Sequence, residues 1–520
     1  MMKRSLIACL AGATMLAGCN LAPAYVRPLG AAPAALPQGG VYPAAATDAP
    51  DVTRVGWRDF FLAPRLRLVI ETGLANNRDL RIAAANVLQA RAQLRTQRSS
   101  LVPTLGVTGS ATFTNNALGA TGATAGGTGA ATGGTASGTG TGTAAGSGTG
   151  TSGGGAAVET GAGVGGGGSD VEYYSLNAGF SNFELDLFGR VHNLARAAQE
   201  QVFASQEAQR STRISLIAEI ANAWLTMAAD QDQLLVARRT LATFRQTLDL
   251  TAAQFRIGVG SELEVRQAET NFQAARNDIA TLETRIAQDG NALNLLVGAP
   301  VPADQLPTGL GDAQVTPDAL PAGLSSDVLL RRPDVLQAEH QLIAQHANIG
   351  AARAAFFPTI SLTAAVGTIS TALSGLFAGG SFSYTGAPGV SLPLFDGGAR
   401  RGNLDYARAS RDVAVASYER TVQTAFREVA DALAQRGRIG EQVDAQTARA
   451  NASRTAARLS EARFRAGVDS FLNTLDAQRT AYAAEQQLAA TRLTRASNLV
   501  VLYRSLGGGV VDVGGAPAVR

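Results

Sequence analysis

The run Phe255–Ser261, FRIGVGS, is written again 209 residues later as Phe464–Ser470, FRAGVDS. A second pair of matches, Val102-Pro103-Thr104 and Phe357-Pro358-Thr359, is separated by 255 residues instead. Self-similarity at a fixed offset indicates a duplicated structural unit. The two offsets differ by 46 residues, so we expect a duplicated structural unit with an insertion in its first copy.

The insertion is conspicuous in the first copy. Residues 115–169 are almost wholly Gly, Ala, Thr and Ser, and Glu159 is their only charged residue. A tract of this composition buries too little apolar surface to offset its chain entropy. We therefore predict a disordered loop that joins two packed elements of the first copy.

Alternating apolar and small polar residues flank the insertion. The stretches 105–114 and 174–181 place apolar side chains on one face and hydroxyls or amides on the other, and 360–367 and 382–394 repeat the pattern in the second copy. A period of two predicts β-strands. The apolar face of such a sheet meets a protein core in a soluble fold and lipid in a membrane barrel. Because four strands cannot close a barrel alone, a barrel would require several chains.

Long helices are predicted after each pair of strands. Residues 190–297 and 400–505 are rich in Ala, Gln, Glu and Arg and nearly free of proline. A helix of about 65 residues would span about 100 Å, and Gly258 and Gly467 mark where each one turns back. One apolar stripe has heptad-like spacing and predicts coiled-coil packing: Ile214, Ile217, Ala221, Trp224, Ala228 and Leu235.

The chain begins like an exported protein. Lys3 and Arg4 precede an apolar stretch, and Leu16-Ala17-Gly18-Cys19 resembles a bacterial lipobox. The resemblance implies cleavage after residue 18 and a lipid on Cys19, as an S-diacylglyceryl and an N-acyl group. Asn20 in the next position favours the outer membrane over retention at the inner one.

Composition excludes several classes of function. The chain of 520 residues has two cysteines and a single lysine, Lys3, so its body can hold no P-loop or Schiff-base lysine. Without the signal peptide the formal charge is +1, which gives no electrostatic reason to expect nucleic-acid binding. The three histidines lack the spacing of a metalloenzyme motif, so we expect no catalytic residue, metal site or cofactor beyond the lipid.

These features divide the chain into consecutive regions. The predicted regions are a signal peptide (1–18), an extended segment after the anchor (19–56), a first repeat (57–298) containing the insertion (115–169), a proline-rich connector (299–325), a second repeat (326–507) and a tail (508–520).

A known family shares several motifs of the second repeat. Arg331–Val335 (RRPDV), Ile349–Arg353 (IGAAR) and Phe356–Leu362 (FFPTISL) resemble the signature of TolC-like outer-membrane efflux lipoproteins of the NodT type, and the resemblance covers nearly the whole mature chain. It implies an α+β membrane protein, a homotrimer in which three sets of four strands close a 12-stranded outer-membrane β-barrel. A long periplasmic α-helical barrel continues that β-barrel. Such proteins are passive exit ducts of tripartite pumps, with a periplasmic adaptor and an inner-membrane transporter, typically of the resistance-nodulation-division class.

The resemblance also implies a gate. Relatives carry acidic residues at the periplasmic tip of the second helix pair in a Leu-Asp-Ala context, which is found here around Asp476. Three copies of Asp476 would concentrate negative charge at a narrow aperture and favour cations. Asn473 stands where some relatives have a second acid, and Gln267 occupies the matching site of the first repeat. Asp469 lies at the same tip, where surface pairing with Arg463 or Arg465 is the plainer expectation.

Two other functions are compatible with parts of this pattern. The long helices would also suit a non-conducting coiled-coil stalk or adhesin-like outer-membrane lipoprotein, and a related trimer could export proteins. The alternating strands favour a channel over a stalk, and the lipobox with the NodT-like motifs favours small molecules over proteins.

Overall fold

The computed structural model describes residues 20–28, 30–43, 55–114, 171–311 and 326–508. Two compact units divide the chain: residues 98–191 and 355–396 form a strand unit, and the other described residues form a helical unit. This division cuts across the two predicted repeats, since each repeat contributes to both units. The predicted signal peptide 1–18, the predicted lipid site Cys19 and the insertion 115–169 lie outside the described residues.

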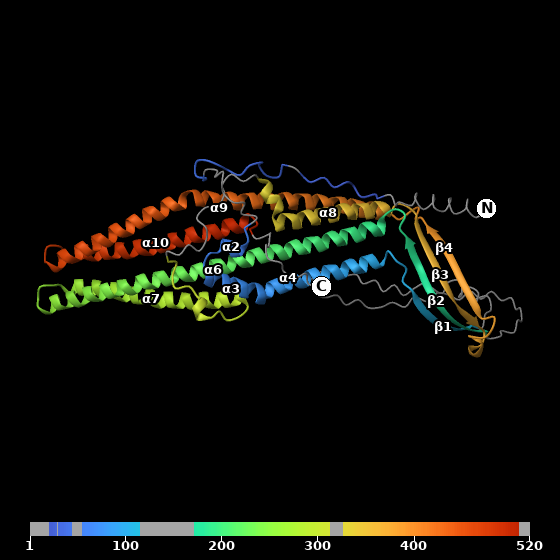
Figure 1. Ribbon diagram of the computed structural model, residues 1–520, viewed down its shortest axis with the longest axis horizontal. Coiled ribbons are helices and arrows are strands. Elements are labelled where there is room, and N and C mark those ends of the chain that lie inside the picture. The colour runs from blue at the N-terminus through green and yellow to red at the C-terminus, as the bar shows by residue number, and fades with distance from the viewer. Residues whose placement is uncertain (1–19, 29, 44–54, 115–170, 312–325, 509–520) are drawn as a thin grey trace, which may run out of the picture. The chain divides into compact units, whose positions relative to one another are not determined.

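The strand unit is a four-stranded antiparallel sheet in the order β1-β2-β3-β4 (Figure 1). Its strands are β1 (Gly106–Thr114), β2 (Val171–Leu185), β3 (Thr359–Ser370) and β4 (Phe382–Ser391). Within the described residues, β1 and β4 each pair on one side only. Each of these two strands therefore presents an edge on which another strand can pair.

The register separates the two faces of the sheet. Val107, Ala178, Val366 and Tyr384 lie opposite one another across all four strands and form an apolar row. The adjacent row is polar or small: Thr108, Asn177, Gly367 and Ser383. This confirms the alternation predicted from the sequence. The apolar row is not covered within its unit, because Val107 is 72% and Tyr384 79% exposed.

Two helix hairpins form most of the helical unit. The first consists of α6 (Arg190–Arg256) and α7 (Glu262–Val297), and the second of α9 (Ala399–Arg465) and α10 (Phe471–Ser505). The long helices α6 and α9 both have 67 residues, as the low proline content predicted. Figure 1 shows the turns of both hairpins at the same end of this unit. No described helix is both long and apolar enough to cross a membrane.

Shorter helices pack around the other end of the hairpins. They are α2 (Trp57–Phe60), α3 (Pro64–Asn76), α4 (Arg78–Ser99), η2 (Ala303–Gln305), η3 (Ser326–Arg331) and α8 (Pro333–Ala354), while η4 (Leu373–Gly375) belongs to the strand unit. The helix α8 packs along α9.

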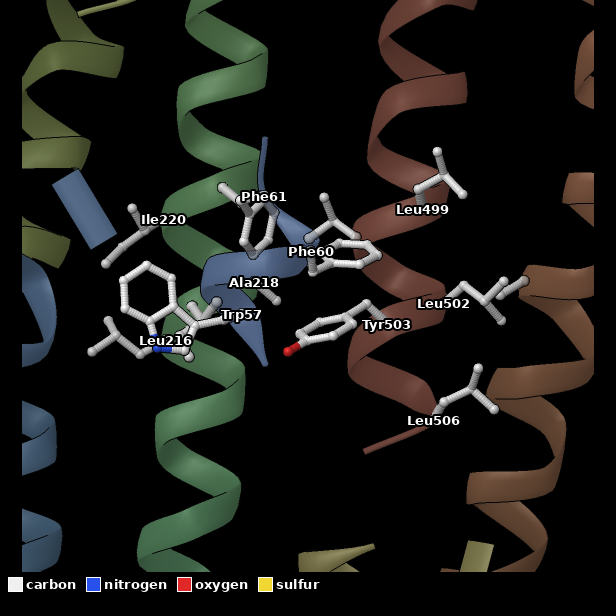
Figure 2. Packing of buried hydrophobic residues seen from close by; sticks show 14 of the residues in the cluster. Trp57, Phe60, Phe61, Leu216, Ala218, Ile220, Leu499, Leu502, Tyr503 and Leu506 are labelled. Carbon is white, nitrogen blue, oxygen red and sulfur yellow. The ribbon is translucent and has the colours of Figure 1, made fainter. Parts of the chain in front are cut away.

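The main hydrophobic core joins α2, α3, α6 and α10. Phe60 lies between the two hairpins and stacks on Tyr503 with ring centroids 4.1 Å apart (Figure 2). Trp57, Phe60 and Phe61 are all buried. The predicted stripe on α6 is buried from Ile214 to Ala228, whereas Leu235 is 48% exposed in the single chain.

Leu235 lies beyond the part of α6 that packs in the main core. The part of α6 in the main core ends at Ala229. Farther along, the buried residues are Ala237, Phe244, Thr247 and Thr251, and Thr247 bonds to Gln478 of α10. Leu235 is not among them, so the heptad pattern does not continue as a buried stripe past Ala228.

Candidate functional site

The turns of the two hairpins share one backbone design. Gly258 and Gly467 have φ values of +81° and +72°, a left-handed conformation that side-chain-bearing residues rarely adopt. Ser261 and Ser470 then cap the returning helices by accepting hydrogen bonds from the backbone three residues on. The repeated sequence FRxGVxS therefore folds the chain back at both predicted places.

The second turn is organised around Asp469. Its Oδ1 accepts hydrogen bonds from the Asn473 side-chain amide at 2.7 Å and from the Ser470 backbone N–H at 2.9 Å. Its Oδ2 lies 3.3 Å from Nε of Arg463, which is one of the two predicted ion pairs. The other predicted partner, Arg465, bonds to Glu461 instead. The amide of Asn473, followed by the Ser470 N–H, holds the pKa of the Asp469 carboxyl below its ordinary value.

Asp476 lies on a different face of α10 from the buried residues. It is exposed, and so is Asn473 one turn earlier, whereas Thr474, Leu475 and Gln478 are buried. Among the described residues Asp476 has no hydrogen-bond or ion-pair partner. The structure thus joins two of the three predicted site residues, Asp469 and Asn473, and leaves the Asp476 carboxylate free to meet solvent or an ion.

The first turn carries a different polar pattern. Ser261 and Glu264 form a capping box, in which the Ser261 Oγ accepts from the Glu264 N–H and the Glu264 carboxylate accepts from the Ser261 N–H at 2.9 Å. Gly260 stands at the position that corresponds to Asp469. The acidic group of this turn is therefore used to cap α7.

Four polar residues join the two hairpins, and the sequence analysis did not predict them. The Gln478 amide donates to the Thr247 hydroxyl at 3.0 Å, and both residues are buried. Two turns along α10 from Thr474, the Tyr482 hydroxyl donates to Asp278 on α7 at 2.9 Å. We call Thr247, Asp278, Gln478 and Tyr482 the inter-hairpin set. Its members hold α10 against α6 and α7 near the turns.

Apolar residues support the inter-hairpin set. Phe471 and Leu475 at the start of α10 pack with Phe464 and with Ala268 of α7. Phe471 is 2% exposed. The second turn is therefore packed against the first hairpin, and separating the hairpins here would expose apolar as well as polar groups.

A buried arginine lies at the other end of the helices. Arg332 is 7% exposed and donates to Asp334, to Glu428 at 2.9 Å and to the Ser505 carbonyl. It borders a cavity of about 190 Å³. Because every arm of its guanidinium is used within the protein, Arg332 joins α8 to α9 and α10 and leaves little capacity for a ligand.

Comparisons with known proteins agree on one family. The model of the outer membrane efflux protein family matches residues 69–299 and 324–508. The toluene efflux pump outer membrane protein TtgC of Pseudomonas putida is 41% identical over 511 residues, which are 98% of this chain and 96% of that protein. The cation efflux system protein CusC of Escherichia coli is 35% identical over 499 residues, 96% of this chain and 98% of that protein.

Solved structures give the same result. The open state of the MtrE outer membrane channel of Neisseria gonorrhoeae has a TM-score of 0.78 and 34% identity, and the match covers 94% of this chain and 98% of that one. A structure of CusC has a TM-score of 0.77 over 94% of this chain and all of that chain. The similarity thus spans both the strand unit and the helical unit, and the chain belongs to the outer membrane efflux protein family, whose members are transport channels and not enzymes.

Proposed function

We propose that this chain is the passive outer-membrane exit duct of a tripartite efflux system that exports small molecules. The observation that carries the proposal is that the chain is similar to outer-membrane components of efflux pumps along almost its whole length. The match to TtgC covers 98% of this chain. Relatives are named for the efflux of toluene, antibiotics and cations. These names support export of small solutes, driven by an inner-membrane transporter and bridged by a periplasmic adaptor.

The duct is a homotrimer built from a duplicated unit. Four strands are too few to close a barrel, and β1 and β4 offer free edges within the described sheet. Three sheets joined edge to edge give 12 strands, with the row of Val107 and Tyr384 toward lipid and the row of Thr108 and Ser383 toward water. The hairpins continue the duct as a helical barrel in the periplasm, where α6 alone is about 100 Å long.

Lipidation of Cys19 anchors each chain in the outer membrane. The lipobox-like run before Cys19 supports it, and no other cysteine remains in the mature chain. Mass analysis of the N-terminal peptide should find a diacylglyceryl group and an acyl chain on Cys19. Finding a free thiol there would refute the anchor without affecting the duct.

Asp476 lines the gate at the tip of the duct. Its exposed, unpaired carboxylate and the neutral Asn473 one turn away suit a ring of three acids that attracts cations. The same charges repel one another and resist burial in a narrow aperture unless a cation screens them. Asp469 acts less directly, because its hydrogen bonds to Asn473 and Ser470 hold the turn in place.

Single-channel recording in planar bilayers tests the duct and the gate. The wild-type protein should conduct and be blocked by divalent cations from the periplasmic side. Asp476→Ala should weaken that block, whereas Gln267→Ala, the matched change in the first hairpin, should not. An unchanged block in Asp476→Ala would refute the gate, and an absence of conductance in every variant would refute the duct.

Electron microscopy of the detergent-extracted protein tests the assembly. Class averages should show a hollow three-fold tube longer than about 100 Å, the length set by the helical rise of α6. Compact or single-chain particles would overturn the trimer.

A further inference from the structure

A short segment near the N-terminus, which is part of the blue trace in Figure 1, lies along α8. We call residues 20–27 the strap. The carbonyl of Leu21 accepts a hydrogen bond from Arg353, near the end of α8, at 3.1 Å. Arg27, at the other end of the strap, bonds to Glu339, which lies two turns into α8. The strap and the helix therefore run in opposite directions.

The contacts between these ends follow one register. A Cβ placed on Gly350 would lie 2.8 Å from Ala22, so the strap passes directly over the helix backbone. The Tyr25 ring packs edge-on against the His346 ring with centroids 5.6 Å apart. Successive strap residues thus meet successive turns of α8.

The lengths of the two segments match. The six residue-to-residue steps from Leu21 to Arg27 span about 20 Å in an extended chain. The fourteen steps from Glu339 to Arg353 span about 21 Å in a helix. Adding or removing a residue of the strap would break the contact at one end or the other.

Glu339 fixes this register. Its side chain is 9% exposed, and its carboxylate accepts two hydrogen bonds from Arg27, at 2.9 and 2.8 Å, and one from the Tyr25 hydroxyl at 2.9 Å. Hydrogen bonds that involve two charged groups are the strong ones, and a buried carboxylate without them is unfavourable. Within the described residues, the strap therefore supplies every hydrogen-bond partner of the Glu339 carboxylate, and Glu339 in turn holds the strap.

We propose that the strap is a clasp that holds the lipid-bearing N-terminus at the end of α8 that leads into β3, with Glu339 as the positioning residue. The inference rests on the proposed lipidation of Cys19, the residue directly before the strap. Four residues, 355–358, separate α8 from β3, so Ala354 and Thr359 lie at most about 18 Å apart. The lipid thus enters the membrane close to where the chain itself enters. Through the strap, the lipid is connected to α8. When the contacts between the strap and α8 are broken, the eight strap residues become a flexible linker between the lipid and the folded chain.

Thiol labelling of the full-length protein in outer-membrane vesicles tests the clasp. Ala22→Cys places a reporter against Gly350, and Val26→Cys places one at a residue that is 75% exposed. A maleimide should label position 26 at once and position 22 slowly. Arg27→Ala, which changes only the strap, should raise the rate at position 22 by about tenfold or more and leave position 26 unchanged.

Further variants separate the clasp from a general loss of structure. Glu339→Ala should act like Arg27→Ala, and the exchange of Arg27→Glu with Glu339→Arg should restore slow labelling at position 22. Equal rates at position 22 with and without Arg27→Ala would overturn the clasp. The chain without a reporter should remain unlabelled because Cys19 carries lipid. If it labels, the anchor proposal fails while the rates at position 22 still decide whether the strap is held.

Discussion

The two hairpin turns have the same backbone and different surroundings. Both use a left-handed glycine and a serine cap. In the first turn, the apolar residues Phe255 and Ile257 are 47% and 75% exposed. In the second turn, Phe464 and Phe471 are buried against the first hairpin. Local sequence thus sets the shape of a turn, while contacts with the rest of the chain decide whether it is a free tip or a packed one.

The polar side chains of the two turns also have different hydrogen-bond partners. Glu264 caps its own helix in the first turn, whereas the corresponding Asn473 donates to Asp469 in the second. The second turn therefore has an internal polar network of its own, and α10, which follows it, carries the inter-hairpin residues Gln478 and Tyr482. We expect changes in the second turn and in α10 to affect opening of the duct, and matched changes in the first turn to have little effect.

The largest difference is expected at the first residue of the returning helices. Phe471→Ala removes a ring that is 2% exposed and should lower the free energy of unfolding by about 3–5 kcal/mol. The matched change, Glu262→Ala, alters an exposed side chain and should stay within about 0.5 kcal/mol. Thermal unfolding followed by circular dichroism measures both. Equal losses would show that the two turns are packed alike.

The next effect concerns the bond between α10 and α7. Tyr482→Phe removes the hydroxyl that donates to Asp278 and should cost about 1.5–3 kcal/mol, the range for hydrogen bonds to charged groups. Because this bond ties the hairpins together near the turns, single-channel conductance should rise. Gln273→Ala is the matched control on α7, at an exposed residue. A tighter channel in Tyr482→Phe would contradict a role of the inter-hairpin set in closure.

The sequence predicted local features better than partners. Periods of two and the repeated FRxGVxS runs located the strands and the turns, because both depend on residues close together in the chain. Tyr482 and its partner Asp278 are 204 residues apart, and Arg27 and Glu339 are 312 apart. Spacing along α10 indicates which face Tyr482 occupies, but not which helix covers that face. Leu235 shows the same limit, since its stripe continues in the sequence beyond the part of α6 that packs in the main core.

A smaller effect on stability is expected at two acids of the first hairpin that the second hairpin lacks. Asp230 is buried and Asp289 is partly buried. Asp230 and Asp289 correspond by the 209-residue offset to Ile439 and Asn498. Burial, and then the charge of Asp230, raise the pKa of the Asp289 carboxyl, and its Oδ2 has no hydrogen-bond partner. A raised pKa in the folded state makes ionisation unfavourable, and this cost is absent below the unfolded pKa of about 3.9.

Asp289→Asn should therefore stabilise the protein near pH 7 by up to about 1 kcal/mol. The gain should shrink as the pH falls toward 4, where the wild-type carboxyl binds a proton in either state. Melting temperatures of both proteins across this range measure it. A gain that is independent of pH would mean that ionisation of Asp289 is not its source.

The smallest effect concerns Asp469, the residue that distinguishes the second turn from the first. Asp469→Gly makes the second turn match the first at this position, and it removes the acceptor for Asn473 and Ser470. The pKa of Asp469 is lowered in the folded state, so its carboxylate stabilises the turn above the unfolded pKa and loses that effect as the pH falls through the lowered value. The melting temperature of the variant should be below that of the wild type at pH 5–7, and the difference should narrow below about pH 4.

The reverse change, Gly260→Asp, should not build the network in the first turn. A Cβ there would lie 3.1 Å from Gln254, and Glu264 already caps α7. If Gly260→Asp gained the same acid-sensitive stability, the difference between the two turns would reside in this one residue and not in the packing around it.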